Sequence, residues 1–293
     1  MANTFLTANA PVIAQTALSA LYKQLVLPQL VWRDVANDLR PGLGGTVTIP
    51  KPAVLTARTF NRAAGTPITL DEVAETGVNV VIDKHLYSAV GIPDEDNTLN
   101  IADFARQILV PQTQAVSQDV EAGVASVFTA LAATNDITVP RDKPVNAIPK
   151  AWQYLTTRNV PQTGRYLVMG AEFAATLLAD DKVSRADAAG EVSALRAAAF
   201  SPLFGFQPFE SNAIPADQAF AFTREAVALV TKTPSNPRGA TASELVNQNG
   251  IQMRWLSDYD AAYLRDRSIV SILFGASLVD ANRVVRLKLA AAS

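Results

Sequence analysis

The sequence predicts a mixed α+β protein, and three observations support that class. Short segments with the alternation or the β-branched composition of strands occur along the chain, for example at 46–49, 78–87 and 283–289. One long segment, 100–134, instead repeats its apolar residues every three or four positions, as an amphipathic helix does. No internal repeat is present, so the 293 residues form one large domain or two.

Composition excludes several classes of function. The chain has no Cys and one His, which rules out disulfides, a Cys nucleophile and thiolate or multi-His metal centres. Its formal net charge of −2 differs from the basic balance of a dedicated nucleic-acid binder. Hydrophobic residues make up 49% and charged residues 18%, against about 25% charged in an average globular protein. We therefore expect apolar surface that other subunits cover.

The N-terminal part should contain a helix and two strands joined by a long connection. Helical spacing of apolar residues covers 11–27 and stops before Pro28. A glycine-rich turn precedes a strand at 46–49, and a second strand follows at 78–87. Residues 52–77 between them show no strong helical period, and connections this long are usually functional or disordered. We expect a projecting loop there.

Residues 100–134 show the clearest helical pattern. Asn100 can cap the helix, and the face opposite the apolar stripe is polar. A continuous helix to Thr134 would be roughly 50 Å long at 1.5 Å per residue. Pro111 should kink it, because a proline ring clashes one turn back and removes an N–H donor. Such a helix needs a broad surface to pack against.

The remaining chain is predicted as short alternating elements. The expected helices are 147–157 and 171–178. The expected strands are 165–169, 203–209, 219–222, 226–230, 251–256, 268–274 and 283–289. Residues 180–190 are small and polar, so we expect them to be mobile, and a Pro- and Asn-rich segment at 233–239 interrupts the pattern.

Three groups of residues offer chemistry, and for each we favour a structural explanation. His85 lies in a predicted strand beside a lysine, which is typical of a partly exposed structural histidine rather than a catalytic base. The acidic run 94–96 lacks the Gly and the distal Glu of a calcium loop and precedes a helix, whose dipole favours acids. Asp258 and Asp260 share one face of a strand, as paired glycosidase carboxylates would, but nearby arginines indicate a solvated hairpin tip.

Other catalytic and targeting signals are missing from the sequence. It contains no glycine-rich phosphate loop in the right context and no nucleophile elbow, so we expect no catalytic residue, no cofactor and no metal. No basic residue precedes Lys23, which is unlike a secretory signal. The most continuous apolar stretch, 124–133, is much shorter than the ~20 residues of a membrane span. We expect a soluble, unsecreted chain.

The order of these elements resembles the major capsid (coat) proteins of tailed bacteriophages, which have the Hong Kong 97-type fold. Local sequences agree along nearly the whole chain, most of them within the first 135 residues. The stretches that carry the resemblance are Met1-Ala-Asn-Thr-Phe-Leu-Thr, Leu30-Val-Trp-Arg-Asp34, Gly45-Thr-Val-Thr-Ile-Pro-Lys-Pro52, Ile82-Asp-Lys-His85 and Ile272-Leu-Phe-Gly275. None of these stretches is a catalytic signature.

The resemblance implies a division of the chain into five parts. They are an N-terminal arm at 1–35, an extended loop with its strands at 46–85, a peripheral domain with the spine helix at 86–136, an axial domain at 137–249, and C-terminal strands at 250–293 shared by the peripheral and axial domains. Apolar and long side chains of the arm and loop become candidates for inter-subunit contacts: Trp32, Arg58, Phe60, Arg62 and Leu70. Some members of this fold crosslink a loop Lys to a neighbour's Asn. Segment 52–77 has no Lys, so we expect no such crosslink.

The same resemblance implies a function without a reaction. The chain would assemble with itself into hexamers and pentamers of an icosahedral shell around phage double-stranded DNA. It would be found in the virion capsid after assembly in the host cytoplasm. Contact with packaged DNA would be non-specific, and scaffolding, portal and decoration proteins would be separate partners. An encapsulin-type nanocompartment shell and, more remotely, a carboxylate-dependent glycoside hydrolase are the alternatives.

Overall fold

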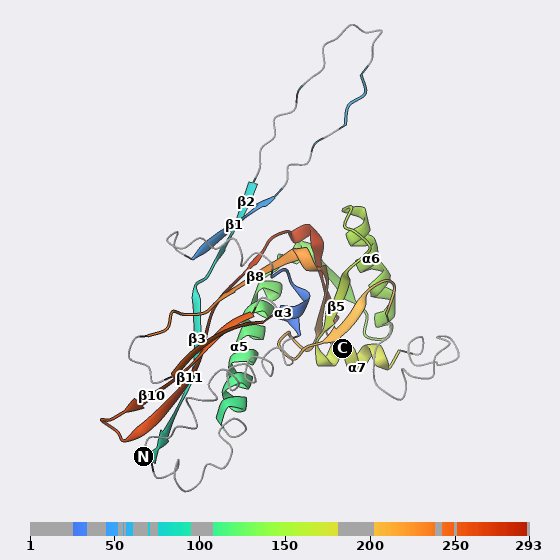
Figure 1. The fold of residues 1–293 in the computed structure, drawn as a ribbon. Helices are drawn as coiled ribbons and strands as arrows, with labels where there is room; N and C mark the ends of the chain where they lie inside the picture. Colours follow the sequence, from blue (N-terminus) through green and yellow to red (C-terminus); the bar gives the residue numbers. More distant parts are fainter. Residues whose placement is uncertain are drawn as a thin grey trace.

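The computed structural model describes residues 26–33, 45–51, 55, 57–60, 70, 76–94, 108–180, 202–237, 242–248 and 251–291. Figure 1 shows a long sheet crossed by a helix, a second sheet with its own helices, and a hairpin that projects away from both. Nearly all of the helix expected at 11–27, the start of the helix expected at 100–134 and nearly all of the segment 180–190 lie outside the described residues. No described helix is long and apolar enough to cross a membrane.

The projecting hairpin begins with a two-stranded antiparallel sheet. Strand β1 (Thr46–Lys51) pairs with β2 (Thr76–Val81), from Thr46 opposite Val81 to Lys51 opposite Thr76. Strands are therefore confirmed at both ends of the long connection. The single strand expected at 78–87 is wrong, because the chain breaks at Ile82–Asp83 and continues as β3 (Lys84–Pro93). The break occurs because β2 pairs with β1, whereas β3 pairs with β11 (Arg265–Leu278) of another sheet.

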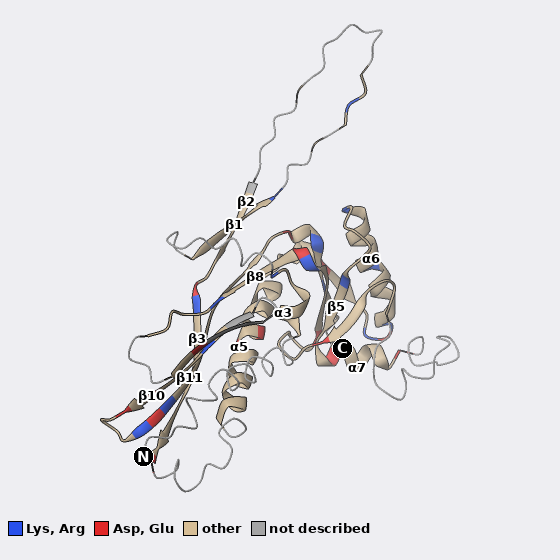
Figure 2. Cartoon of the chain, in the orientation of Figure 1, with Lys and Arg blue, Asp and Glu red and all other residues tan. Residues whose placement is uncertain are grey.

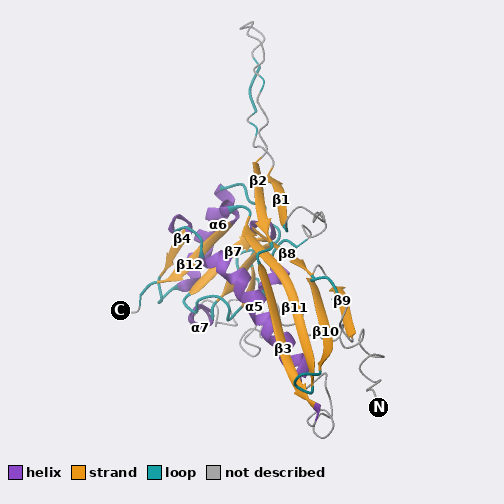
Figure 3. Cartoon of the chain, turned by 90° about the vertical axis from the view of Figure 1, so that its left-hand side faces the viewer, coloured by secondary structure: helices purple, strands orange, loops and turns teal. Residues whose placement is uncertain are grey.

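The long sheet consists of five antiparallel strands. Its order is β3-β11-β10-β9, and β8 pairs with the second half of β11. The strands not yet bounded are β8 (Val227–Lys232), β9 (Ala242–Gln248) and β10 (Ile251–Asp260). Helix α5 lies along one face of this sheet, as the side view in Figure 3 shows. The range expected for the axial domain contains β8 and β9, yet both strands pair within the long sheet.

Helix α5 (Val110–Thr129) buries its apolar stripe against alternate residues of β11. The contact includes Val116, Val120 and Val124 on the helix and Val270 and Ile272 on the strand. The helix was expected to reach residue 134 but ends at Thr129, and a 3₁₀ turn, η4 (Ala133–Asn135), follows. Pro111 occupies the first turn of α5, where no N–H donor is needed. Residues 101–107, on the other side of the expected kink, are outside the described part.

The second sheet has the order β4-β12-β7-β5-β6. Its strands are β4 (Asp136–Val139), β5 (Arg165–Met169), β6 (Gln207–Glu210), β7 (Gln218–Thr223) and β12 (Val284–Leu289). One face packs on α6 (Ile148–Thr157) and α7 (Ala171–Leu178), through residues such as Leu167 and Leu287. The other face packs on α5, through residues such as Val168 and Phe220. The alternation of strand side chains thus separates two cores.

Most of the short elements agree with the sequence pattern. Helices α6 and α7 and strand β5 are confirmed close to their expected bounds. Strand β6 starts four residues later than expected, because Phe204 and Gly205 form a tight turn with positive φ angles of 50° and 82°. Short helical turns complete the described chain: α3 (Leu27–Leu30), η5 (Pro144–Ala147), η6 (Arg224–Ala226) and η7 (Ala281–Arg283).

Candidate assembly surfaces

The root of the projecting hairpin is held by its own subunit. Val47, Ile49 and Val80 are buried against Ala228 and Val230 of β8, in a small core separate from the other two. The Lys51 ammonium lies 3.2 Å from the Asp280 carboxylate at the far end of β1. The hairpin therefore has a rigid base, and its direction is determined by β8.

Beyond this base, the described side chains of the hairpin are exposed. Leu55 is 58% exposed, Phe60 60% and Leu70 84%, and Arg58 is also exposed. Burying such apolar side chains contributes about 1.5–3 kcal/mol each, so their exposure in a single subunit forgoes a large stabilisation. Arg62, the remaining loop candidate, lies outside the described residues. A contact of these residues with a neighbouring subunit stays a prediction.

Trp32 differs from the loop candidates because it packs within its own chain. The backbone N–H of Trp32 donates to the carbonyl of Val227 at 3.0 Å, and the backbone carbonyl of Trp32 accepts from the N–H of Leu229 at 2.8 Å. The half-buried indole packs against the core at the hairpin root. Trp32 therefore fixes its segment of the chain to β8, and an additional contact with a neighbour stays a prediction.

Two glycines that are not among the predicted contact residues allow the hairpin root, β11 and α5 to stack closely. A Cβ on Gly275 would lie 1.9 Å from the carbonyl oxygen of Val81. A Cβ on Gly123 of α5 would lie 2.4 Å from the ring of Phe274. The available signals were a glycine at the end of the expected strand 268–274 and an isolated glycine inside the helical pattern, and both can mark a close approach or a packing constraint.

The residues weighed for chemistry are placed in structural contacts. Asp258 accepts two hydrogen bonds from the Arg267 guanidinium, at 2.9 and 2.6 Å, and Asp260 lies 3.4 Å from Arg265. These pairs close the β10–β11 hairpin, which confirms the hairpin tip expected there. His85 is exposed on β3, and the described residues contain no group of three or more His, Cys, Asp or Glu that could hold a metal ion.

The same hairpin tip carries a carboxyl group with a shifted pKa. Burial raises the pKa of Asp266, and the neighbouring Asp94 and Asp258 raise it further. Asp94 also accepts a hydrogen bond from the Tyr259 hydroxyl at 2.9 Å, which raises the pKa of Tyr259. The folded state therefore binds a proton at Asp266 more strongly than the unfolded chain does.

Replacing Asp266 with Asn should stabilise the protein at neutral pH. Because the pKa of Asp266 is raised in the folded state, the stability that Asp266 contributes is fully present below the pKa of an unfolded Asp, about 4. This contribution is lost as the pH rises through the higher pKa of the folded state. The Asp266→Asn variant should therefore melt a few °C higher at pH 7, and the difference should shrink towards pH 4. Thermal unfolding across this range checks it, with the exposed Asp142→Asn as control. A variant that melts lower than the wild type at pH 7 would contradict this.

Comparison with known proteins identifies similar solved structures. No protein-family model matches the chain, and no curated protein matches it significantly. A structure from Mycobacterium phage Che8 is 24% identical, with a TM-score of 0.69, and the match covers 90% of this chain and 91% of that one. The capsid structure of the cyanophage P-SCSP1u is 17% identical, with a TM-score of 0.63 and coverage of 85% and 84%.

A third match comes from a different kind of particle. The crystal structure of a virus-like particle from Pyrococcus furiosus is 12% identical, with a TM-score of 0.56 and coverage of 94% and 96%. All three matches span most of both chains, so the likeness concerns the complete arrangement of hairpin, long sheet, helix and second sheet. The chain therefore has the Hong Kong 97-type fold found in the capsids of tailed bacteriophages.

Proposed function

We propose that this chain is a major capsid protein that assembles with itself into the icosahedral head shell of a tailed phage. The observation that carries the proposal is the likeness to phage capsid structures over most of both chains. The exposed distal hairpin supports it, because a surface of this kind is stabilised only when a neighbouring subunit covers it. Hexamers and pentamers of the chain are the rings that such a shell requires.

We propose a division of the subunit that follows its two sheets. We assign α5 and the long sheet, including β8 and β9, to the peripheral domain. The second sheet with α6 and α7 is then the axial domain, and its described residues begin near Asp136. We also assign the C-terminal strands to both domains, because β10 and β11 pair in the long sheet and β12 pairs in the second sheet. The N-terminal arm would end at α3 and the strand-like contact of Trp32.

Several partners follow from this function. The shell would enclose double-stranded DNA with loose, non-specific contacts, which agrees with the near-zero net charge of −2. Scaffolding, portal and decoration proteins would be separate chains that meet the shell during or after its assembly in the host cytoplasm.

Negative-stain electron microscopy of the expressed full-length chain tests the proposal. We expect uniform closed particles or, at lower yield, rings and partial shells. A preparation that stays monomeric over a wide range of protein and salt concentrations would contradict a shell function.

The content of native particles separates a phage head from a nanocompartment. The likeness to the Pyrococcus furiosus virus-like particle makes this second candidate worth testing. Particles from the natural source should contain double-stranded DNA if the chain is a phage coat protein. Particles that contain a protein cargo and no DNA would favour the encapsulin-type shell.

A further inference from the structure

Two exposed basic side chains lie on α6 and at its C-terminal end. This α6 face consists of Lys150, Gln153 and Arg158. Trp152, which is 37% exposed, lies on the opposite side of the helix from Lys150, because two positions turn a helix by about 200°. The Arg158 guanidinium stacks 3.5 Å from the ring centre of Tyr154, which holds the charge against the helix. The surrounding segment 143–171 has no Asp or Glu, although the whole chain has a net charge of −2. Figure 2 shows the basic residues in this region.

A buried arginine lies beneath α6, on the side of the helix that carries Trp152. Arg165 is 1% exposed and donates to the carbonyls of Val160 and Pro161 and to the hydroxyl of Thr156. All of these acceptors are neutral, and burial lowers the pKa of the guanidinium. Its centre lies 6.0 Å from the Trp152 ring. A buried charge with only neutral acceptors favours an anionic surface nearby, since screening by water is weak there.

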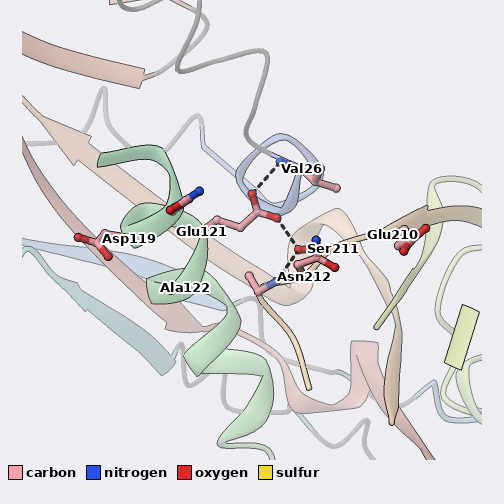
Figure 4. Close-up of a pocket in the computed structure, with 9 residues that line it drawn as sticks. Val26, Asp119, Glu121, Ala122, Glu210, Ser211 and Asn212 are labelled. Atoms are coloured by element: carbon pink, nitrogen blue, oxygen red, sulfur yellow. Dashed lines mark hydrogen bonds between the residues drawn. The ribbon is translucent and has the colours of Figure 1, made fainter. Parts of the chain in front are cut away.

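A pocket on α5 has the opposite charge. It has a volume of about 530 Å³, and its described lining residues include three acidic ones, Asp119, Glu121 and Glu210, and no Lys or Arg. Figure 4 shows the Glu121 carboxylate inside it, accepting from the Val26 N–H at 3.3 Å and the Ser211 hydroxyl at 2.5 Å. Asp119 and Glu210 are exposed at the pocket. Segment 107–140, which includes α5, has three acidic residues and no basic one.

These two surfaces lie on opposite faces of the second sheet. Leu167 of β5 points into the core beneath α6, whereas the next residue, Val168, points into the core shared with α5. A subunit with two different, complementary patches on opposite sides can associate head to tail, and such heterologous contacts generate rings when the rotation closes. Opposite charges across the contact would also set the orientation of the two copies.

We infer that the α6 face of one copy docks onto the acidic α5 pocket of the next copy around a ring. The inference rests on the proposed shell function and adds the residues that determine how two neighbouring copies contact each other. Lys150 and Arg158 face Asp119 and Glu210 of the adjacent copy. Glu121 is occupied by bonds within its own chain and supports the wall of the pocket.

Two charge-reversal variants of the full-length chain test this contact. The first is Lys150→Glu with Arg158→Glu, and the second is Asp119→Lys with Glu210→Lys. Each alone should give a yield of rings and shells at least about tenfold below wild type, because like charges then meet at every lateral contact. An equimolar mixture should restore six-membered rings, because alternating copies again place opposite charges together. Five-membered rings should stay depleted, since an odd number of copies cannot alternate.

Controls separate a failed contact from a failed fold. Circular dichroism should show that both variants are folded. A control variant, Lys84→Glu with Lys288→Glu, makes the same charge change as the first variant at exposed lysines outside the α6 face, and it should still assemble. Wild-type assembly of either variant, or a mixture that restores no rings, would overturn the inference while the shell function stands. Variants of Lys150 and Arg158 that assemble normally but package less DNA would show that the α6 face meets nucleic acid instead. Failure of the wild type to assemble would refute the proposed function itself.

Discussion

Deletion of residues 56–74, with a short Gly-Ser connection in their place, should abolish shell assembly and leave a folded subunit. The base of the hairpin is buried on β8 through Val47, Ile49 and Val80, so the base does not depend on the distal part. The described distal side chains Phe60 and Leu70 are 60% and 84% exposed, so their removal costs the isolated subunit little. In a shell, the deletion would remove the burial of these side chains, which contributes about 1.5–3 kcal/mol each.

Electron microscopy and size-exclusion chromatography measure assembly, and thermal unfolding measures the subunit. We expect no closed shells and a melting temperature close to that of unassembled wild type. A double variant, Phe60→Ser with Leu70→Ser, keeps the loop length and should reduce shell yield partially, which shows whether apolar contact or loop length matters. Shells of the deletion variant at wild-type yield would refute the assembly role of the loop.

Gly275→Ala should destabilise the subunit by about 3 kcal/mol or more. The added Cβ would lie 1.9 Å from the Val81 carbonyl oxygen and 3.0 Å from the Ile82 Cα. Both neighbours are backbone atoms, so no side-chain rotation relieves the overlap. β11 must move away from the hairpin root, and this movement disturbs the pairing of β11 with β8 and β3. Urea unfolding of the unassembled subunit measures the loss.

The matched control is Gly205→Ala, which separates steric overlap from backbone conformation. Gly205 has a φ of 82° and no atom within 4 Å of its Cβ position. An alanine there should cost only about 1 kcal/mol, because the penalty comes from the left-handed conformation alone. Equal losses for the two variants would show that the close approach at Gly275 does not limit stability.

The sequence predicted most elements correctly because their signals are local. The strand at 46–49, the helix through 110–129 and the elements β5, α6 and α7 each show their own period of buried residues. The hairpin tip at Asp258 and Asp260 was predicted for the same reason, since its ion pairs join residues of adjacent strands that are only five and nine positions apart in the sequence. The absence of Cys and the single His excluded disulfides, thiolate sites and multi-His metal centres from composition alone.

The candidate surfaces depended on contacts between residues that are far apart in the chain. The break at Ile82–Asp83 exists because β2 and β3 belong to different sheets. The local sequence pattern does not determine with which strand another strand pairs. The placement of β8 in the long sheet and the packing of Trp32 on it are likewise pairings of distant segments. Loop exposure was predicted, but the rigid base that directs the loop was not.

What the sequence determined by itself is the order and type of most elements and the absence of Cys, since periodicity is a property of neighbouring residues and composition does not depend on the fold. Only the tertiary structure decided that Lys150 and Asp119 lie on opposite sides of one sheet, because alternate side chains of the sheet's strands separate the α6 core from the α5 core. It also decided that Gly275 must lack a side chain, because Val81 reaches it from nearly two hundred residues away. Packing of the cores brings residues that are distant in the sequence close together in space. This packing forms the surfaces through which copies of the chain would meet.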